Sequence, residues 1–287
     1  HKLSFIYFLK FYVSMNIISK NICSLKKDFT ESYSGHKHTQ ELLPVAKTDF
    51  LPIDDDHLTS LANFIESNPI YDNTFEMKLC GIKCNIHEGD LNQYWIDSIK
   101  HDTSYAPFYP TWLLSAYTLS LMAKQMGFTN LIDIGSGDGR ISFCGEIVGL
   151  ESISIEIDEQ LSNLQNNIIQ KTNVHFKTIN ADATQIKFTD LKLKRPVFFI
   201  GGVPQNGEIL AESIIKNILA IPELEKTSCF VLTGTLTKEK FLKNKLNYGW
   251  ETTLKKFHLM ETEITILPTY WTMEQSFETP YIFTKYT

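Results

Sequence analysis

The stretch LIDIGSGDGR, residues 131–140, combines the end of a strand, a glycine-rich turn and the start of a helix. Its apolar first half predicts a strand buried on both faces, as the strands of parallel sheets are. Gly135, Gly137 and Gly139 then follow at every second position. Gly135 and Gly137 would let bare backbone approach a ligand, and Gly139 would let the next helix pack close to the strand. The stretch therefore predicts a cradle for a nucleotide-like ligand.

The spacing of these glycines separates two kinds of ligand. The dinucleotide pattern G-x-G-x-x-G would require glycine at position 140, where this chain has Arg140, so a nicotinamide cofactor is disfavoured. The pattern D-x-G-x-G-x-G, which starts at Asp133, instead resembles the first motif of class I S-adenosylmethionine-dependent methyltransferases. The resemblance implies S-adenosylmethionine as the cofactor, bound at Asp133, Gly135, Ser136, Gly137 and Gly139.

Two further acidic residues follow predicted strands. Glu156 closes the strand predicted over residues 152–158, near where a doubly wound sheet places an acid for the ribose hydroxyls. Asp182 follows the third strand and matches the acid that the family places near the adenine. The following acid, Asp158, is interpreted as a helix cap. The resemblance adds Thr111, Ile157 and Ala183 to the expected cofactor-binding residues.

The segment APFYPT, residues 106–111, precedes a helix predicted over residues 112–126. It resembles the proline-rich loop before the glycine motif in archaeal protein-lysine methyltransferases and their mitochondrial relatives. In those families this loop lies over the cofactor and lines the channel of the target lysine, which makes Tyr105 and Tyr109 expected substrate-binding residues. A second interpretation is a turn that caps the helix through Thr111, and both stay open.

The sequence GGVPQNGE, residues 201–208, leaves a strand predicted over residues 196–202. Ligands lie beyond the carboxyl ends of such strands, so Gly201 and Pro204 are expected substrate-binding residues. The segment lacks the Asp, Asn or Ser followed by two prolines and an aromatic residue that amide and base N-methyltransferases commonly carry. This argues against an adenine or glutamine N-methyltransferase. The alternative is a plain turn into the helix predicted over residues 208–220.

The expected fold is α/β, with a doubly wound, mostly parallel, seven-stranded sheet of the Rossmann-like methyltransferase type. Three segments are expected: a poorly ordered or fragment-derived arm over residues 1–56, a helix and hairpin extension over 57–106, and the core over 107–287. After a helix predicted over residues 238–246 the chain looks strand-like throughout, and the resemblance implies a terminal antiparallel pair.

Composition and charge narrow the function classes. The 287 residues are 43% hydrophobic and 21% charged, as in ordinary globular proteins. A net charge of −6 makes nucleic acid a less favoured partner than protein. Five scattered cysteines indicate no disulfide framework and favour the cytoplasm. The apolar run over residues 1–14 is interrupted by polar residues and too short to span a bilayer, so we expect no membrane segment.

One cluster of candidate metal ligands is Cys80, Cys84 and His87 in the predicted hairpin. Structural zinc needs four ligands, and no second pair with the usual spacing follows. The histidines of HKH, residues 36–38, stand in a polar run typical of a solvated segment. We therefore expect no metal.

The function that these patterns favour is methyl transfer by in-line displacement, with a protein lysine as the acceptor. A small-molecule or RNA methyltransferase and a non-catalytic, cofactor-binding scaffold are the alternatives. No residue identifies itself as a general base. The oligomeric state stays open.

Overall fold

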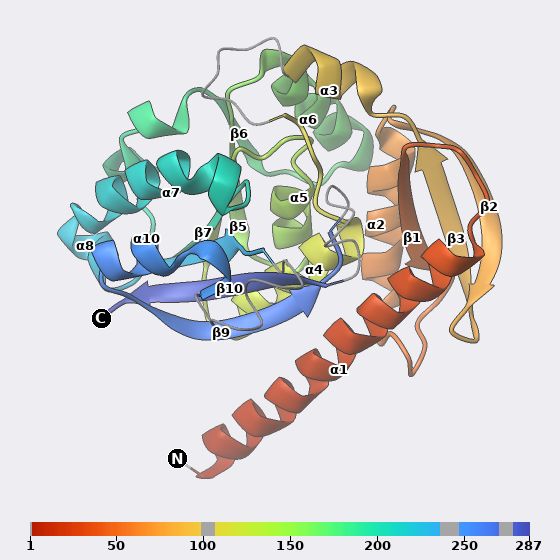
Figure 1. The fold of residues 1–287 in the computed structure, drawn as a ribbon, viewed down its shortest axis with the longest axis horizontal. Coiled ribbons are helices and arrows are strands. Elements are labelled where there is room, and N and C mark those ends of the chain that lie inside the picture. The colour runs from red at the N-terminus through yellow and green to blue at the C-terminus, as the bar shows by residue number, and fades with distance from the viewer. Residues whose placement is uncertain (1, 99–106, 236–246, 270–277) are drawn as a thin grey trace.

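The computed structural model describes residues 2–98, 107–235, 247–269 and 278–287, which form two sheets with helices around them (Figure 1). The strands are β1 (Thr39–Pro44), β2 (Tyr71–Leu79), β3 (Ile82–Gly89), β4 (Asn130–Ile134), β5 (Glu151–Glu156), β6 (Lys177–Asn180), β7 (Pro196–Ile200), β8 (Cys229–Thr233), β9 (Leu259–Leu267) and β10 (Thr279–Tyr286). The α-helices are α1 (Lys2–Ser32), α2 (Asp55–Ser67), α3 (Asn92–Ser98), α4 (Leu113–Gln125), α5 (Arg140–Ile147), α6 (Glu159–Thr172), α7 (Pro204–Leu219), α8 (Pro222–Glu225) and α10 (Glu251–Lys256). Short 3-10 helices are η1 (Ala183–Gln185), η2 (Phe188–Leu191) and η3 (Asn247–Gly249).

The larger sheet has seven strands in the order β6-β5-β4-β7-β8-β10-β9. Its first five strands run parallel, and β10 pairs antiparallel with both β8 and β9. The expected α/β fold and its terminal antiparallel pair are confirmed. The strand order reverses between β4 and β7, because the chain moves outward from β4 to β6 and then returns to the other side of β4.

Hydrophobic side chains of the central strands point alternately to two separate cores. Leu131 and Val197 lie in the core that α1, α2, α4, α5 and α6 cover, and Ile132 and Phe198 lie in the core that α7, α8 and α10 cover. Both faces of β4 and β7 are therefore buried, which explains their nearly continuous apolar sequence.

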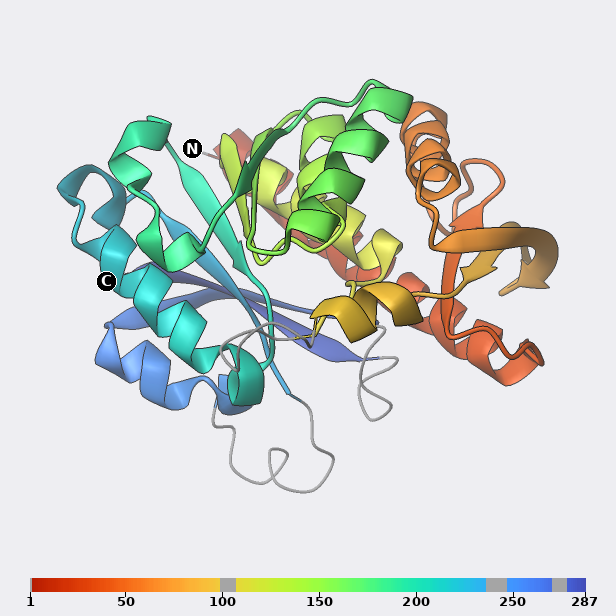
Figure 2. The same cartoon turned by 90° about the horizontal axis from the view of Figure 1, so that it is seen from above.

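The smaller sheet has the order β1-β3-β2, and all its pairs are antiparallel. Its hairpin of β2 and β3, which the sequence predicted, turns at Cys80 and Gly81. Viewed from above, the orange strands of this sheet lie at one end of the molecule and α8 lies at the other (Figure 2). The smaller sheet contacts the rest of the structure in part through β1, which packs against α2 and α4.

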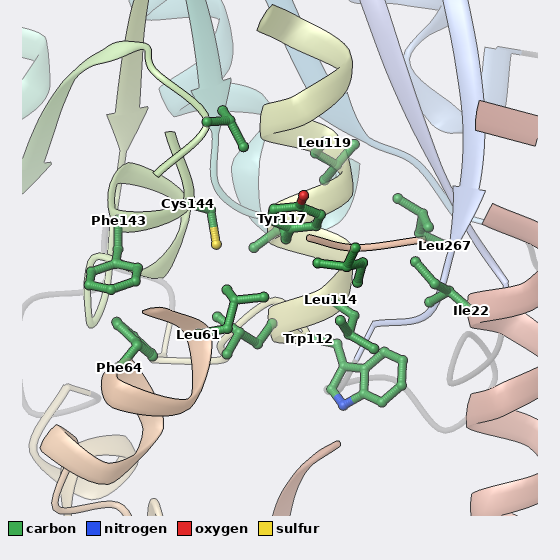
Figure 3. Packing of buried hydrophobic residues seen from close by; sticks show 14 of the residues in the cluster. Ile22, Leu61, Phe64, Trp112, Leu114, Tyr117, Leu119, Phe143, Cys144 and Leu267 are labelled. Carbon is green, nitrogen blue, oxygen red and sulfur yellow. The ribbon is translucent and has the colours of Figure 1, made fainter. Parts of the chain in front are cut away.

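The loosely ordered arm expected before residue 56 is wrong for much of that stretch, which forms α1 and β1. The side chain of Ser19 on α1 hydrogen-bonds that of Thr265 on β9 at 2.9 Å. Ile22 is fully buried beside Leu267, in the cluster that also holds Trp112 (Figure 3). These partners are more than 80 residues away in sequence, so local composition did not indicate them.

Several boundaries also differ from expectation. Residues 251–256 form helix α10 rather than a strand, with Leu254 buried against the α7 side of the sheet. Helix α7 begins at Pro204, four residues earlier than expected, because proline suits the first helical turn. The helix predicted over residues 238–246 lies outside the described residues. Within the described ranges, no helix combines the length and apolar character that a bilayer crossing requires.

Candidate functional site

The three glycines after β4 all have positive φ, of +69° at Gly135, +59° at Gly137 and +79° at Gly139, but their surroundings differ. A Cβ added to Gly135 would meet no atom within 4 Å, and this residue is exposed. A Cβ at Gly137 would lie 2.5 Å from the Phe108 ring. One at Gly139 would lie 2.9 Å from the Phe176 ring. Open backbone for a ligand is therefore found at Gly135, whereas Gly137 and Gly139 permit close packing.

Gln165 of α6 hydrogen-bonds to the glycine turn. This role was not predicted from the sequence. Its Nε2 donates to the Ser136 hydroxyl at 2.9 Å and to the Gly137 carbonyl at 2.7 Å. The Ser154 hydroxyl donates to Gln165 Oε1 at 2.5 Å, and Gln165 is fully buried. A signal existed, because Gln165 is a polar residue at helical spacing within the buried stripe that Leu161, Leu164 and Ile168 form on α6. The Ser136 side chain is thus buried and bonded to Gln165, where it helps to fix the turn.

Glu156 lies at the carboxyl end of β5, next to the glycine turn, as expected. Its Oε2 accepts from the Gly137 amide at 2.7 Å, and its Oε1 accepts from the Asp158 amide at 2.9 Å. Burial raises the pKa of Glu156, and these backbone hydrogen bonds oppose the rise. Each carboxylate oxygen has a second lone pair, so the group keeps capacity to accept from ligand hydroxyls.

Asp133 occupies a different position from Glu156, at the next-to-last residue of β4 and facing α5. Its carboxylate accepts from the Ser142 hydroxyl at 3.5 Å, and its exposed fraction is 3%. Burial, and then the nearby charge of Glu156, raise the pKa of Asp133 to about 8. The side chain therefore lies under the first turn of α5 and not on the open side of Gly135.

The ends of β5 and β6 are joined by a side chain that the sequence reasoning also missed. Asn180 Nδ2 donates to the Glu156 carbonyl at 2.9 Å and to the Ile157 carbonyl at 3.1 Å. The exposed Asp182 follows, and its Oδ1 accepts from the Thr184 amide at 2.9 Å, which caps η1. Ala183 is buried at the start of η1. Glu156, Ile157 and Asp182 thus share the carboxyl edge of the sheet.

Gly201, the first residue after β7, lies against the glycine turn. Its amide donates to the Ile134 carbonyl at 3.0 Å, and a Cβ added to it would lie 3.3 Å from the Gly135 carbonyl. Both Gly135 and Gly201 are exposed, on opposite sides of the point where the strand order reverses. Ligands of doubly wound sheets bind at this point. Pro204, in contrast, is buried in the first turn of α7.

The segment before α4 lies over the glycine turn, because the Phe108 ring covers Gly137. Tyr109 is 39% exposed, with its ring 6.4 Å from that of Trp95 on α3. Tyr105 lies outside the described residues. The cap interpretation of Thr111 is wrong, since the N-cap of α4 is Trp112 without a side-chain cap bond. The carbonyl of Thr111 instead accepts from Arg140 Nη1 at 2.7 Å.

From the sequence alone, Asp138 has no assigned role, and Arg140 only disfavours a nicotinamide cofactor. Both are almost fully buried, and the guanidinium of Arg140 donates to both oxygens of Asp138, at 2.9 and 2.6 Å. An arginine directly after a glycine motif was the available signal. Within the described ranges, no group of three or more His, Cys, Asp or Glu side chains is arranged to hold a metal ion.

Comparison with known proteins gives one match in sequence. A stretch of 71 residues is 35% identical to the protein-lysine methyltransferase METTL21E of Mus musculus. It covers 24% of this chain and 29% of the mouse protein, so well under two thirds of that relative is spanned. No family model matches the chain.

Similar solved structures include methyltransferases of several substrates. The O-methyltransferase of Bacillus cereus has a TM-score of 0.45 and 13% identity, over 69% of this chain and 90% of that one. The precorrin-6y C5,15-methyltransferase of Geobacter metallireducens has a TM-score of 0.42 and 19% identity, over 63% and 92%. The tRNA (uracil-54, C5)-methyltransferase of Pyrococcus abyssi has a TM-score of 0.45 and 14% identity, over 62% and 39%.

The order and direction of the strands in the larger sheet identify the fold of this chain. Five parallel strands with β4 at the reversal point are extended by β10, which is antiparallel to both of its neighbours. This arrangement is the one that the glycine motif implied. The chain therefore has the seven-stranded α/β fold of the class I S-adenosylmethionine-dependent methyltransferases.

Proposed function

We propose that the protein is an S-adenosylmethionine-dependent methyltransferase. The observation that carries the proposal is the exposed, positive-φ backbone of Gly135, where an added Cβ would meet nothing within 4 Å. It lies at the reversal point of the sheet, beside Gly201 and close to the buried carboxylate of Glu156. A ligand that needs bare backbone and a hydrogen-bond acceptor fits this arrangement.

The residues present fit an adenosyl ligand. Glu156 offers a carboxylate with spare lone pairs to ribose hydroxyls, and the exposed Asp182 offers one to an exocyclic amine on the same sheet edge. Gly135 and Gly201 leave room at the backbone between β4 and β7. S-adenosylmethionine, when bound, supplies a sulfonium methyl group that is open to nucleophilic attack. The tasks left to the protein are to orient both reactants and to exclude water.

The acceptor that we propose is a protein lysine. Two observations support it: the 71-residue match to a protein-lysine methyltransferase, and the placement of the 107–111 segment over the glycine turn. A free lysine has a pKa near 10.4, so its amine must lose a proton before it attacks. Burial between aromatic walls would favour the neutral amine, and the exposed ring of Tyr109 stands beside Trp95 in a position to form such a wall.

Cofactor binding tests the proposal most directly. Titration calorimetry with S-adenosylmethionine and S-adenosylhomocysteine should show binding by the full chain. Glu156→Ala should weaken it by about 1 to 3 kcal/mol, the range for losing hydrogen bonds to a charged group. Glu151→Ala is the matched control at the opposite end of β5, where Glu151 accepts from Asn130 Nδ2 at 2.9 Å. Equal affinities of the two variants would remove Glu156 from the site, and absence of binding by the wild type would refute the function.

A labelling experiment identifies the acceptor. The protein is incubated with cell lysate and tritiated-methyl cofactor, and labelled species are separated and read by mass spectrometry. Label on a lysine of a protein supports the proposed acceptor. Label in RNA or in small molecules assigns the other acceptor classes and contradicts lysine. Cofactor binding without any label assigns a scaffold role instead of catalysis.

A further inference from the structure

The guanidinium of Arg140 joins three segments that are far apart in sequence. Its Nε and Nη2 donate to Asp138, at the end of the glycine turn. Its Nη1 donates to the Thr111 carbonyl at 2.7 Å and forms an ion pair with Glu41 of β1 at 2.5 Å. Only 2% of Arg140 is exposed. One buried side chain therefore connects the glycine turn, the segment before α4 and the smaller sheet.

Glu41 holds both Arg140 and the beginning of α4. Its Oε2 accepts from the Leu113 amide at 2.8 Å, and Leu113 is the first residue of that helix. Its Oε1 also accepts from the Tyr71 hydroxyl of β2 at 3.1 Å. Because Leu113 and Arg140 bond to the same carboxylate, Glu41 sets the position of the 108–113 segment relative to the glycine turn.

That relative position matters at the glycine turn. The Phe108 ring lies 2.5 Å from where a Cβ of Gly137 would be, so any shift of the 108–113 segment moves this ring relative to the turn. Asp138 is held from another side by Asn68 Nδ2, at 3.0 Å, just after α2. Asp138 and the 108–113 segment are thus both bonded to residues that precede residue 107, Asn68 and Glu41.

The charges of this cluster nearly balance. Arg140 and the buried Lys26 of α1 stand against Asp138 and Glu41, and the Lys26 ammonium lies 4.9 Å from the Trp112 ring centroid. Burial lowers the pKa of Lys26 to about 8, and the charge of Glu41 opposes this. Buried ion clusters add little net stability because desolvation offsets their attraction. We therefore attribute this cluster to the positions that its ion pairs fix, and not to a gain in stability.

We propose that Glu41 is a positioning residue for the cofactor site, so that the N-terminal sheet sets the geometry of the glycine turn and of the segment that covers it. This inference rests on the proposed function. Glu41 touches no part of the open backbone itself and acts through Arg140 and Leu113.

The first test compares Glu41→Gln with Glu88→Gln by calorimetry with S-adenosylmethionine. Glu88 lies on β3 of the same sheet and accepts from Tyr33 and Asn73, away from Arg140. Glu41→Gln should raise the Kd about tenfold, because small displacements of positioned groups cost that much or more. Glu88→Gln should change it by less than about twofold. Equal Kd values for Glu41→Gln and the wild type would overturn the inference.

A double variant separates positioning from charge balance. Lys26→Met combined with Glu41→Gln removes one charge of each sign and should restore the melting temperature if Glu41→Gln lowers it. It should leave the Kd raised, because the hydrogen bonds to Arg140 are still altered. Recovery of both the melting temperature and the Kd would show that Glu41 only balances charge, and would contradict the inference.

Hydrogen exchange of the ligand-free proteins keeps this test independent of the proposed function. In the double variant, peptides covering residues 111–114 and 134–140 should exchange faster than in the wild type, whereas Glu88→Gln should not change them. Unchanged exchange in the double variant overturns the positioning role even if the wild type binds no cofactor. Failure of the wild type to bind, with faster exchange in the variant, refutes the cofactor and leaves the positioning role supported.

Discussion

Strand β4 of the seven-stranded sheet and strand β1 of the three-stranded sheet differ in how far their local sequence predicts their burial. β4 has five buried residues in a row and is followed at once by its glycine turn. β1, in contrast, has the sequence TQELLP, in which the charged Glu41 is 2% exposed and is paired with Arg140, the first residue of α5. The strand β4 and its turn are encoded by neighbours in sequence, whereas the burial of Glu41 on β1 depends on a partner 99 residues away.

The difference teaches where local patterns lose their value. An apolar run flanked by glycine predicts both a strand and the burial of that strand. A polar residue such as Glu41 or Lys26 looks solvated until its partner is known, and the partner here lies on another element. The N-terminal helix and strand therefore looked like a loose arm, although tertiary contacts order them.

Glycine turns in the two sheets offer the strongest test of this contrast. Gly81 and Gly137 both have positive φ, but a Cβ at Gly81 meets nothing within 4 Å, whereas one at Gly137 meets Phe108 at 2.5 Å. Gly137→Ala should lower the free energy of unfolding by about 2 to 5 kcal/mol, from backbone strain plus overpacking. Gly81→Ala should cost about 1 to 2 kcal/mol, from strain alone.

Urea unfolding of both variants measures these costs. Equal losses would mean that Phe108 moves aside freely and that the 108–113 segment is not fixed over the turn. Because Phe108 would be displaced in Gly137→Ala, that variant should also bind S-adenosylmethionine more weakly, and Gly81→Ala should bind it as the wild type does.

Much of the core and the placement of Glu156 could be predicted from sequence, since parallel strands end at one edge and carry their polar residues there. The acids were nevertheless treated alike, and the structure separates them. Glu156 is the last residue of β5 and lies beside the turn. Asp133 pairs with Ser154, two residues before Glu156, and its side chain lies under α5. Gln165 and Arg140 stand out in the sequence, but their hydrogen-bond partners could not be predicted, because these depend on how α6 and β1 pack.

Asp133 and Glu41 are buried acids in the two regions, with opposite electrostatic surroundings. The neighbouring charges of Glu156 and Asp138 raise the pKa of Asp133 further, in addition to burial, whereas Arg140 and Lys26 oppose the effect of burial on Glu41. Asp133 should therefore be protonated in the folded protein at neutral pH, and its neutral isostere should be tolerated.

The pH dependence of Asp133→Asn follows from linkage. The folded pKa of about 8 is above the ordinary value of 3.8, so the contribution of Asp133 to stability is complete below pH 3.8 and is lost as the pH rises to about 8. Asparagine does not ionise, so the variant should gain stability over the wild type progressively from pH 4 to pH 8. Denaturant unfolding at pH 5 and pH 8 measures this gain. A constant difference in stability between Asp133→Asn and the wild type at the two pH values would contradict the raised pKa of Asp133.

Helix caps give the smallest contrast between the two regions. Asp54 is the N-cap residue of α2 and Asp158 that of α6, but only the Asp158 side chain accepts from helix amides, those of Gln160 and Leu161. Asp54 instead forms an exposed ion pair with Lys47. Asp158→Ala should therefore lower the free energy of unfolding by about 1 kcal/mol, the usual cost of a lost cap. Asp54→Ala should unfold close to the wild type, because exposed ion pairs contribute little. Equal losses would mean that the Asp54 side chain caps α2 in solution, and that local sequence identifies helix caps equally well in both regions.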